Sequence, residues 1–167
     1  MSTKRFVSSH ARRMPLRRRP SGLRPAPPLG IFPTPLDVRD LHERIDEVLA
    51  RKRGGYTWTG RWQFDADSKS DMARIYEDLG PRVMHVIATT NRTFAEWQRH
   101  PESAFGPVGP NSGLGAWRSD DGTVYIDNIM VRFGLTDDQA RRIARSYGQK
   151  SVLKVDGRNR VHAFLDV

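Results

Sequence analysis

Residues 1–36 constrain the fold of this chain more than any other segment, because they hold seven of its eleven prolines and none of its acidic residues. Proline interrupts helices and central strands, and few large apolar residues accompany these prolines. Such a segment cannot bury enough surface to offset the entropy lost on ordering. We therefore expect a disordered Arg/Pro-rich arm at residues 1–36 and one folded domain at residues 37–167, a length usual for a domain.

The net charge of +9 arises in this arm. Eight of the 28 basic residues lie there, which leaves 20 basic residues to balance the 19 acidic residues of the domain. An unstructured arm with this charge neutralises phosphates and releases counterions, which predicts salt-dependent, sequence-independent binding of nucleic acid. The arginines expected to make these contacts are Arg12, Arg13, Arg17, Arg18, Arg19 and Arg24.

The composition of the chain also bears on targeting and membrane segments. The Arg-rich, acid-free arm is also typical of an organellar transit peptide, whereas the apolar core and cleavage site of a secretory signal are missing. The longest apolar run, residues 83–88, is far below the ~20 residues of a membrane helix, so we expect no membrane partner. We predict a cytoplasmic protein, or an organellar-matrix protein if the arm is a transit peptide. The chain has no cysteine, which excludes disulfide scaffolds and thiolate zinc sites.

The spacing of apolar residues predicts alternating helices and strands in residues 37–167. We expect helices at 37–53, at 69–79, from Asn91 or Thr93 onward and at 137–147, strands at 56–64, 83–89, 123–131, 151–155 and 160–165, and a Gly/Pro loop at 101–115. The last two strands form a hairpin around Asp156 and Gly157. Because no glycine-rich nucleotide motif is present, we predict a compact α+β domain with a mixed or mostly antiparallel sheet.

Aromatic side chains at even-numbered positions give the strand at 56–64 an aromatic face, formed by Tyr56, Trp58, Trp62 and Phe64. Beside Arg61, a residue such as Trp58 is suited to stacking on the bases of single-stranded nucleic acid. The same pattern is more often the core face of a sheet, and we favour that interpretation. On the helix at 137–147 we expect Ala140, Ile143, Ala144 and Tyr147 to be buried and Arg141, Arg142 and Arg145 to lie on or near the exposed side.

An enzyme is the principal alternative, although the sequence favours a protein without catalytic activity. Its site would lie between the 101–115 loop and the 56–64 strand, with His85, Asn91 and Gln149 as candidate polar groups. His85 lies in an apolar strand and is expected to be a hydrogen-bonded core residue. Asp127 and Asp166 also lie in predicted strands, and we expect both to face outward or to lie at an edge.

Metal and cofactor sites are not predicted. The five histidines have no paired spacing that a metal would require. Residues 65–71 alternate acidic residues as a calcium loop does, but Lys69, Ser70 and Tyr76 stand where the loop needs an oxygen ligand, glycine and glutamate. We interpret the segment as a helix-capping turn.

The last fifty residues or so resemble small uncharacterised α+β proteins of bacteria and actinobacterial phages. The matching positions are Gly115-Ala-Trp117, Gly122, Tyr125, Asp127, Ala140, Ala144, Gly148-Gln149 and Val152. The resemblance implies a bacterial or phage origin, which argues against a transit peptide, and it assigns no catalytic residue.

The leading hypothesis is a small, phage- or plasmid-associated protein that binds nucleic acid, or a host protein that handles nucleic acid, through its arm. The alternatives are the enzyme described above and an assembly component of a nucleoprotein particle. The sequence does not determine the oligomeric state.

Overall fold

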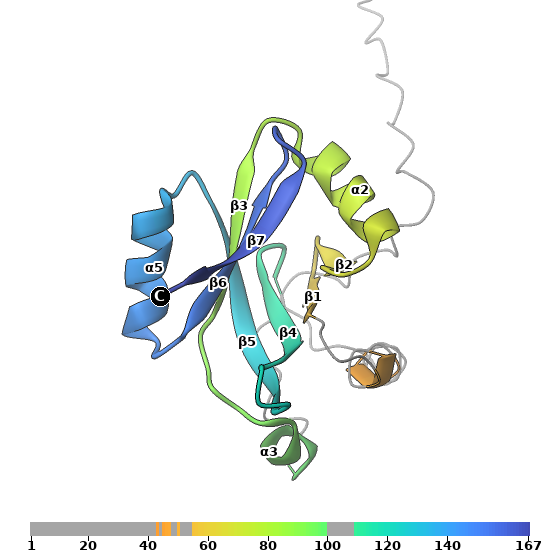
Figure 1. Ribbon diagram of the computed structural model, residues 1–167, viewed down its shortest axis with the longest axis vertical. Coiled ribbons are helices and arrows are strands. Elements are labelled where there is room, and N and C mark those ends of the chain that lie inside the picture. Colours follow the sequence, from red (N-terminus) through yellow and green to blue (C-terminus); the bar gives the residue numbers. More distant parts are fainter. Residues whose placement is uncertain (1–42, 44, 48–49, 51–54, 100–108) are drawn as a thin grey trace, which may run out of the picture.

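The computed structural model describes Glu43, residues 45–47, Ala50 and residues 55–99 and 109–167 (Figure 1). The predicted arm, most of the first predicted helix and most of the 101–115 loop lie outside these residues.

A seven-stranded antiparallel sheet is the centre of the described domain. Its strands lie in the order β2-β1-β4-β5-β3-β6-β7, and every neighbouring pair is antiparallel. Short helical pieces at residues 43 and 45–47 precede it. The elements that follow are β1 (Gly55–Thr59), β2 (Gln63–Asp65), α2 (Lys69–Leu79), β3 (Val83–Ala88), α3 (Phe94–Arg99), β4 (Ser112–Arg118), β5 (Val124–Phe133), α5 (Asp137–Ser146), β6 (Ser151–Asp156) and β7 (Val161–Asp166). The predicted α+β class, the antiparallel sheet and the C-terminal hairpin are confirmed.

Helices pack on both faces of the sheet, and alternate residues of β5 contribute to each. Ile129 and Val131 pack toward α2, on what we call the α2 face. Ile126 packs with Trp97 of α3, and Met130 packs with the apolar side of α5, on what we call the α5 face. Figure 1 shows α2 and α5 on opposite sides of the sheet. A central strand that packs against helices on both faces is apolar on both faces, which is why β5 is a nearly continuous run of β-favouring residues.

The sheet curls around its α2 face. A Cβ atom added at Gly55 of β1 would lie 3.6 Å from Cζ of Phe164 in β7, although four other strands separate β1 from β7 in the sheet order. Such closeness requires the two ends of the sheet to bend toward each other, as the natural twist of strands favours.

The predicted aromatic strand at 56–64 is two strands, and its aromatic residues face opposite ways. Thr59 organises the turn between them, since its hydroxyl accepts hydrogen bonds from the backbone N–H of Arg61 (3.2 Å) and Trp62 (2.7 Å). Tyr56 and Trp58 therefore pack on the α5 face, whereas the aromatic residues that follow the turn, Trp62 and Phe64, pack on the α2 face. The expectation of one shared face was wrong because the turn breaks the alternation.

Residues 112–115, the end of the predicted Gly/Pro loop, belong to strand β4, so the loop prediction is wrong for this part of the segment. Its glycines are required by close packing: a Cβ atom on Gly113 would lie 2.0 Å from the carbonyl oxygen of Trp58 in β1. Glycine inside a strand often marks such an approach of one backbone to another.

Side-chain caps satisfy backbone N–H groups at the starts of α2 and α5. The Ser68 hydroxyl accepts the N–H of Asp71 (3.3 Å) at the start of α2. At α5, Thr136 and Gln139 form a complete capping box, with bonds of 2.9 and 3.2 Å. Ala140 and Ala144 are buried as expected. Tyr147 was expected to be buried with them but is 42% exposed; the helix ends at Ser146, so Tyr147 is its C-cap and not part of its apolar face.

Candidate functional site

A narrow apolar slot lies inside the curl of the sheet, on the α2 face. It encloses about 60 Å³ and is walled by Trp117 of β4 and Phe164 of β7, with Gln149 and Ser151 as polar lining. Gly55 of β1 and Phe164 of β7 both line the slot. A Cβ atom added at Gly55 would lie 3.6 Å from the Phe164 ring, so the slot is narrow between these two residues. A volume of this size holds a few water molecules or a small apolar group.

The buried carboxylate of Asp127 organises the polar end of this region. Oδ1 accepts the Thr90 hydroxyl (3.0 Å) and the Arg92 backbone N–H (2.9 Å), and Oδ2 accepts Nε1–H of Trp117 (3.2 Å). Burial raises the pKa of Asp127, although these three hydrogen bonds act in the opposite direction. The expectation that Asp127 faces outward was wrong, because β5 is central in the sheet and the residue is fully buried. Asp166, on the edge strand β7, is exposed as expected.

Gln149 and Asn91 extend this network as backbone-binding amides. Nε2 of Gln149 donates to the carbonyl oxygen of Thr90 (2.7 Å), and Nδ2 of Asn91 donates to that of Gly148 (3.2 Å). The two predicted site residues are thus brought together, where they fasten the segment after β3 to the end of α5. Both side-chain nitrogen atoms are bound to backbone carbonyl groups of the fold.

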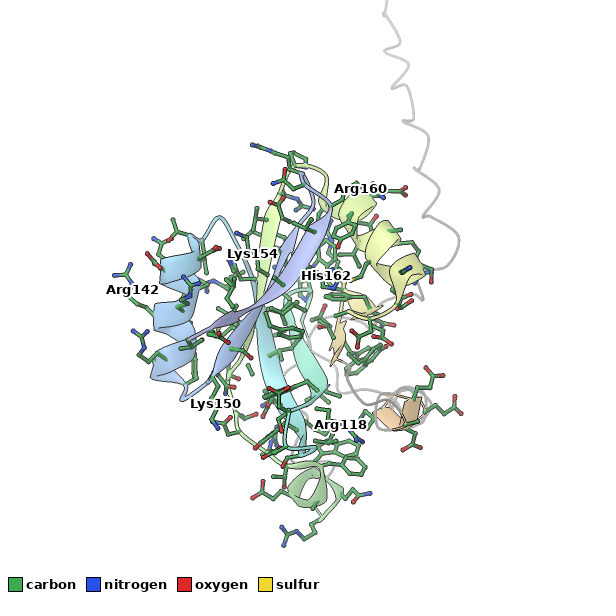
Figure 2. All side chains as sticks on the ribbon, viewed as in Figure 1. Arg118, Arg142, Lys150, Lys154, Arg160 and His162 are labelled. Atoms are coloured by element: carbon green, nitrogen blue, oxygen red, sulfur yellow. The ribbon has the colours of Figure 1, made fainter. Side chains whose placement is uncertain are left out.

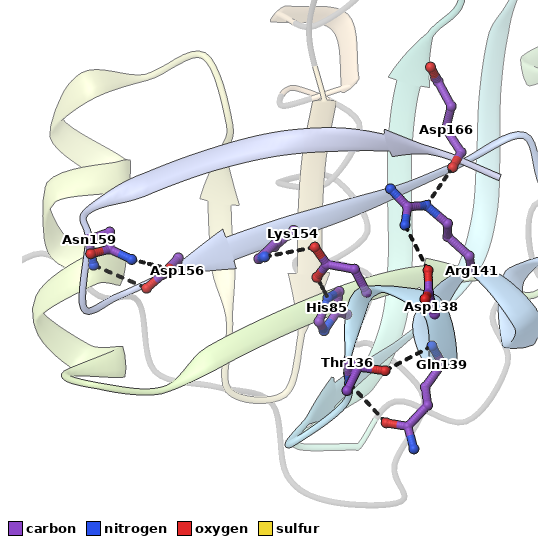
Figure 3. A network of polar contacts seen from close by, with 10 residues as sticks. His85, Thr136, Asp138, Gln139, Arg141, Lys154, Asp156, Asn159 and Asp166 are labelled. Atoms are coloured by element: carbon purple, nitrogen blue, oxygen red, sulfur yellow. Dashed lines mark hydrogen bonds and ion pairs between the residues drawn. The ribbon is translucent and has the colours of Figure 1, made fainter.

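His85, the third catalytic candidate, lies on the opposite face of the sheet. It is fully buried beneath the start of α5, and its Nε2 is 3.0 Å from Oδ1 of Asp137 (Figure 3). Nζ of Lys154 donates to the other carboxylate oxygen (2.9 Å), and these contacts lower the pKa of Asp137, with the Lys154 hydrogen bond as the largest cause. His85 is a hydrogen-bonded core residue, as predicted, and it does not converge with Asn91 and Gln149.

A second concave region lies between α2 and the start of β7. Tyr76 Oη and His162 Nδ1 are 2.7 Å apart, and the guanidinium of Arg160 lies 5.6 Å from the centre of the Tyr76 ring. Lys69 and Asp67 complete the charged lining of this open cleft of about 400 Å³. Burial raises the pKa of Tyr76, and the positive charge of Arg160 partly offsets this increase. No local sequence pattern predicts this cluster, because its members come from segments about ninety residues apart.

The exposed end of α5 carries positive charge and an aromatic ring. Arg142 and Arg145 are exposed one turn apart, Tyr147 is 42% exposed, and Lys150 follows it on the surface. Figure 2 shows Arg142 and Lys150 on the side of the molecule that carries α5. Arg141, which the sequence grouped with them, is instead bound to Asp138 (3.1 Å) and to the backbone oxygen of Asp166 (2.9 Å). We call Arg142, Arg145, Tyr147 and Lys150 the α5 patch.

The remaining predicted nucleic-acid contacts fall into three groups. The six arginines of the arm lie outside the described residues. Arg61 is exposed, with its guanidinium 4.9 Å from the centre of the Trp62 ring. Trp58 is 5% exposed and belongs to the core beside Trp97, so its ring is not a surface platform for a base. The core interpretation of Trp58 is the one that the structure supports.

The acidic segment at 65–71 is a helix-capping turn, as predicted. The backbone N–H of Asp67 donates to Asp65 Oδ1 (2.8 Å), and that of Asp65 donates to Asp71 Oδ2 (2.9 Å). Among the described residues, no three or more His, Asp or Glu side chains are grouped so as to hold a metal ion. In the same part of the chain, no helix is both long enough and apolar enough to cross a membrane.

Comparison of the chain with protein-family models, curated proteins and solved structures finds no match.

Proposed function

We propose that this protein binds nucleic acid, with residues 1–36 supplying the electrostatic attraction and the α5 patch supplying a contact surface on the domain. The observation that carries the proposal is the segregation of charge: eight basic residues and no acidic residue within residues 1–36, beside a nearly neutral domain. Phosphate contacts of this kind dominate affinity for nucleic acid and need no fixed structure.

The α5 patch supports the proposal because it combines cations with an exposed ring. Arg142, Arg145 and Lys150 suit contacts with phosphates, and an exposed Tyr147 suits stacking on an unpaired base. The pKa of Asp121 is lowered to about 2, chiefly by the hydrogen bond from Ser119, and the charge of Lys150 makes a small further contribution, so Asp121 balances part of the Lys150 charge. We expect Arg142 and Arg145 to contribute more than Lys150.

The bacterial or phage origin implied by the C-terminal resemblance, and a cytoplasmic location, belong to the same proposal. A protein of the bacterial or phage-infected cytoplasm has access to both DNA and RNA. The arm by itself does not distinguish between these two polymers, since it contacts phosphates.

The test is fluorescence-anisotropy binding of the full chain to labelled single- and double-stranded DNA and RNA across a salt series. A variant with the six arm arginines changed to glutamine should bind weakly and lose most of the salt dependence, because each lost phosphate contact reduces the slope of log K against log salt by about 0.7–0.9. The matched control changes the same six residues to lysine, which keeps the charge and should keep the slope. Unchanged affinity and slope in the glutamine variant would refute the role of the arm.

The contribution of the domain has its own test. Tyr147→Ala should weaken binding to single strands by about 1–3 kcal/mol without changing the salt slope, since stacking is lost and no charge is removed. Arg145→Gln should lower the slope by about 0.7–0.9 for single strands and double strands alike. If both variants bind as the parent does, the domain makes no contact through α5.

A further inference from the structure

Strand β7 is an edge strand, and its outer edge is open except at its C-terminal end, where Arg141 of α5 binds the backbone oxygen of Asp166. It is the last strand in the sheet order, six residues long, with Val161 56% exposed and Phe164 54% exposed. Edge strands are commonly protected by proline, lysine, a bulge or very short length. β7 has no proline or lysine and pairs with β6 in unbroken register over all six residues. At the opposite edge of the sheet, β2 has three residues, which is short enough to be protected by its length.

The direction of the backbone groups of β7 follows from its pairing with β6. The N–H of Val167 donates to the carbonyl oxygen of Lys150 (3.0 Å). Because hydrogen-bonded and non-hydrogen-bonded pairs alternate in an antiparallel ladder, the odd-numbered residues of β7 bond to β6 and the even-numbered ones point away from it. Asp166 is an even-numbered residue, and its carbonyl oxygen points away from β6 as expected: it accepts a hydrogen bond from Nε–H of Arg141 in α5 (Figure 3). His162 and Phe164 are thus left with outward-pointing backbone groups.

The side chains of β7 make this edge complementary to itself. Leu165 packs in the cluster on the α5 face, so Asp166 points to the α2 face, where the guanidinium of Arg160 also lies, over Tyr76. Arg160 directly precedes β7 and belongs to the turn after β6, where its φ is 53°. In an antiparallel pair of two β7 strands with Ala163 on the two-fold axis, this register places Arg160 of one copy beside Asp166 of the other, at the ends of the paired segment. In the same register His162 is opposite Phe164, so the outward backbone groups of these two residues meet. The attraction between Arg160 and Asp166 at both ends of the paired segment favours this register.

We propose that β7 pairs with β7 of a second copy of this chain, antiparallel and centred on Ala163, to form a two-fold dimer with a continuous sheet. The arrangement provides four backbone hydrogen bonds between His162 and Phe164 of the two copies and two Arg160–Asp166 ion pairs. It uses the same surface on both subunits and leaves only the short β2 edges free, so association closes at two copies.

The arm of the same chain is a poor occupant for this edge. Its seven prolines remove backbone donors that a ladder requires, and its eight positive charges would meet Arg160 and His162. A second copy of β7 brings Asp166 to the same place. One strand pair is small compared with the ~1,200–2,000 Å² buried in stable complexes, so we expect the dimer to depend on protein concentration.

Charge exchange on the full chain tests the partner and the register together. Arg160→Asp places two acidic residues opposite each other, and Asp166→Arg places two arginines opposite each other. Each variant alone should sediment as a monomer at concentrations where the parent is a dimer, with a dimer dissociation constant at least tenfold higher. A mixture of the two variants should form a heterodimer, because both cross-strand pairs are then of opposite charge, and the double variant should dimerise as the parent does. Circular dichroism of each variant checks that it is folded.

A cysteine at the axis provides a measurement that leaves the charges unchanged. The chain has no cysteine, so Ala163→Cys introduces a single thiol, which faces its symmetry mate in a non-hydrogen-bonded pair with Cα atoms about 4.5 Å apart. Mild oxidation should convert this variant to a covalent dimer much faster than Val161→Cys, a comparably exposed position off the axis.

Three outcomes would overturn the proposal. The parent chain would remain monomeric at every concentration, or the two charge variants would fail to form a heterodimer when mixed. Equal cross-linking at Ala163 and Val161 would likewise show that the strands do not meet in this register.

Discussion

At the scale of single residues, the buried carboxylate of Asp127 connects three parts of the chain. It accepts hydrogen bonds from Thr90 and Arg92 before α3 and from Trp117 in β4. Gln149 binds the carbonyl oxygen of the same Thr90, so the end of α5 is joined to the network as well. A single buried acceptor thus positions segments that share no strand pairing with one another.

Asp127→Asn should destabilise the protein by about 1–3 kcal/mol, measured by urea unfolding at neutral pH. The amide oxygen of Asn can still accept hydrogen bonds from Thr90 and Arg92. The amide nitrogen, however, then faces Nε1–H of Trp117, so two hydrogen-bond donors point at each other without an acceptor. Adding Trp117→Phe to Asp127→Asn removes that clash. The double variant should therefore be less destabilised than the sum of the two single changes, and an additive result would contradict this account.

The His85–Asp137–Lys154 cluster predicts a response to acid. The folded-state pKa of Asp137 is lowered, so the carboxylate contributes stability that is present above its unfolded-state pKa and lost as pH falls through its folded-state pKa. Asp137→Asn should lower stability at pH 7 and make unfolding free energy less steeply dependent on pH below about 4. Asp138→Asn, which changes the charge equally at an 85% exposed neighbour, is the matched control. Identical pH profiles for the two variants would count against the cluster.

At the scale of elements, β4 shows how a glycine-rich segment becomes a strand. Gly113 and Gly115 let β4 approach its neighbours more closely than any side chain allows: the Cβ of an alanine would lie 2.0 Å from Trp58 oxygen at the first position and 2.9 Å from Ile129 Cγ2 at the second. Local sequence patterns rich in glycine predict a loop, because they contain no information about the residues of the neighbouring strands that the glycines contact.

Gly113→Ala should cost about 3 kcal/mol or more, because the rigid backbone of β1 cannot move aside. Gly55→Ala is the matched control in the paired strand: its new Cβ would meet ordinary contacts of 3.6 Å or more, so we expect a change within about 0.5 kcal/mol. Thermal or urea unfolding of the two variants measures the difference. Equal stability would show that β1 and β4 can separate at no cost.

At the scale of the whole molecule, the described clusters share one sheet. β3 and β5 contribute side chains to both faces, so neither the α2 core nor the α5 core can be lost while the other stays intact. The slot, the Tyr76 cleft and the β7 edge all depend on the curl that brings β7 back toward β1 and α2.

We therefore expect unfolding to be a single cooperative transition. Trp58, Trp62 and Trp97 are buried in two clusters on opposite faces, so tryptophan fluorescence reports on both cores and circular dichroism reports on the sheet. The two signals should give coincident urea midpoints. Separate midpoints would indicate that one face unfolds independently.

The sequence by itself determined the elements whose signals are local. Ser68 and the Thr136–Gln139 capping box mark the starts of α2 and α5, and Asp156 with Gly157 marks the hairpin between β6 and β7, because caps and turns depend on residues a few positions apart. The apolar run around His85 likewise identified a buried strand. Tertiary structure alone decided which strand is central and which is an edge. The position of β5 at the centre of the sheet buried Asp127, and the curl of the sheet brought His162 of β7 to Tyr76 of α2. The physical reason is that burial depends on what lies across the sheet, and residues that become neighbours there are dozens of positions apart in the chain.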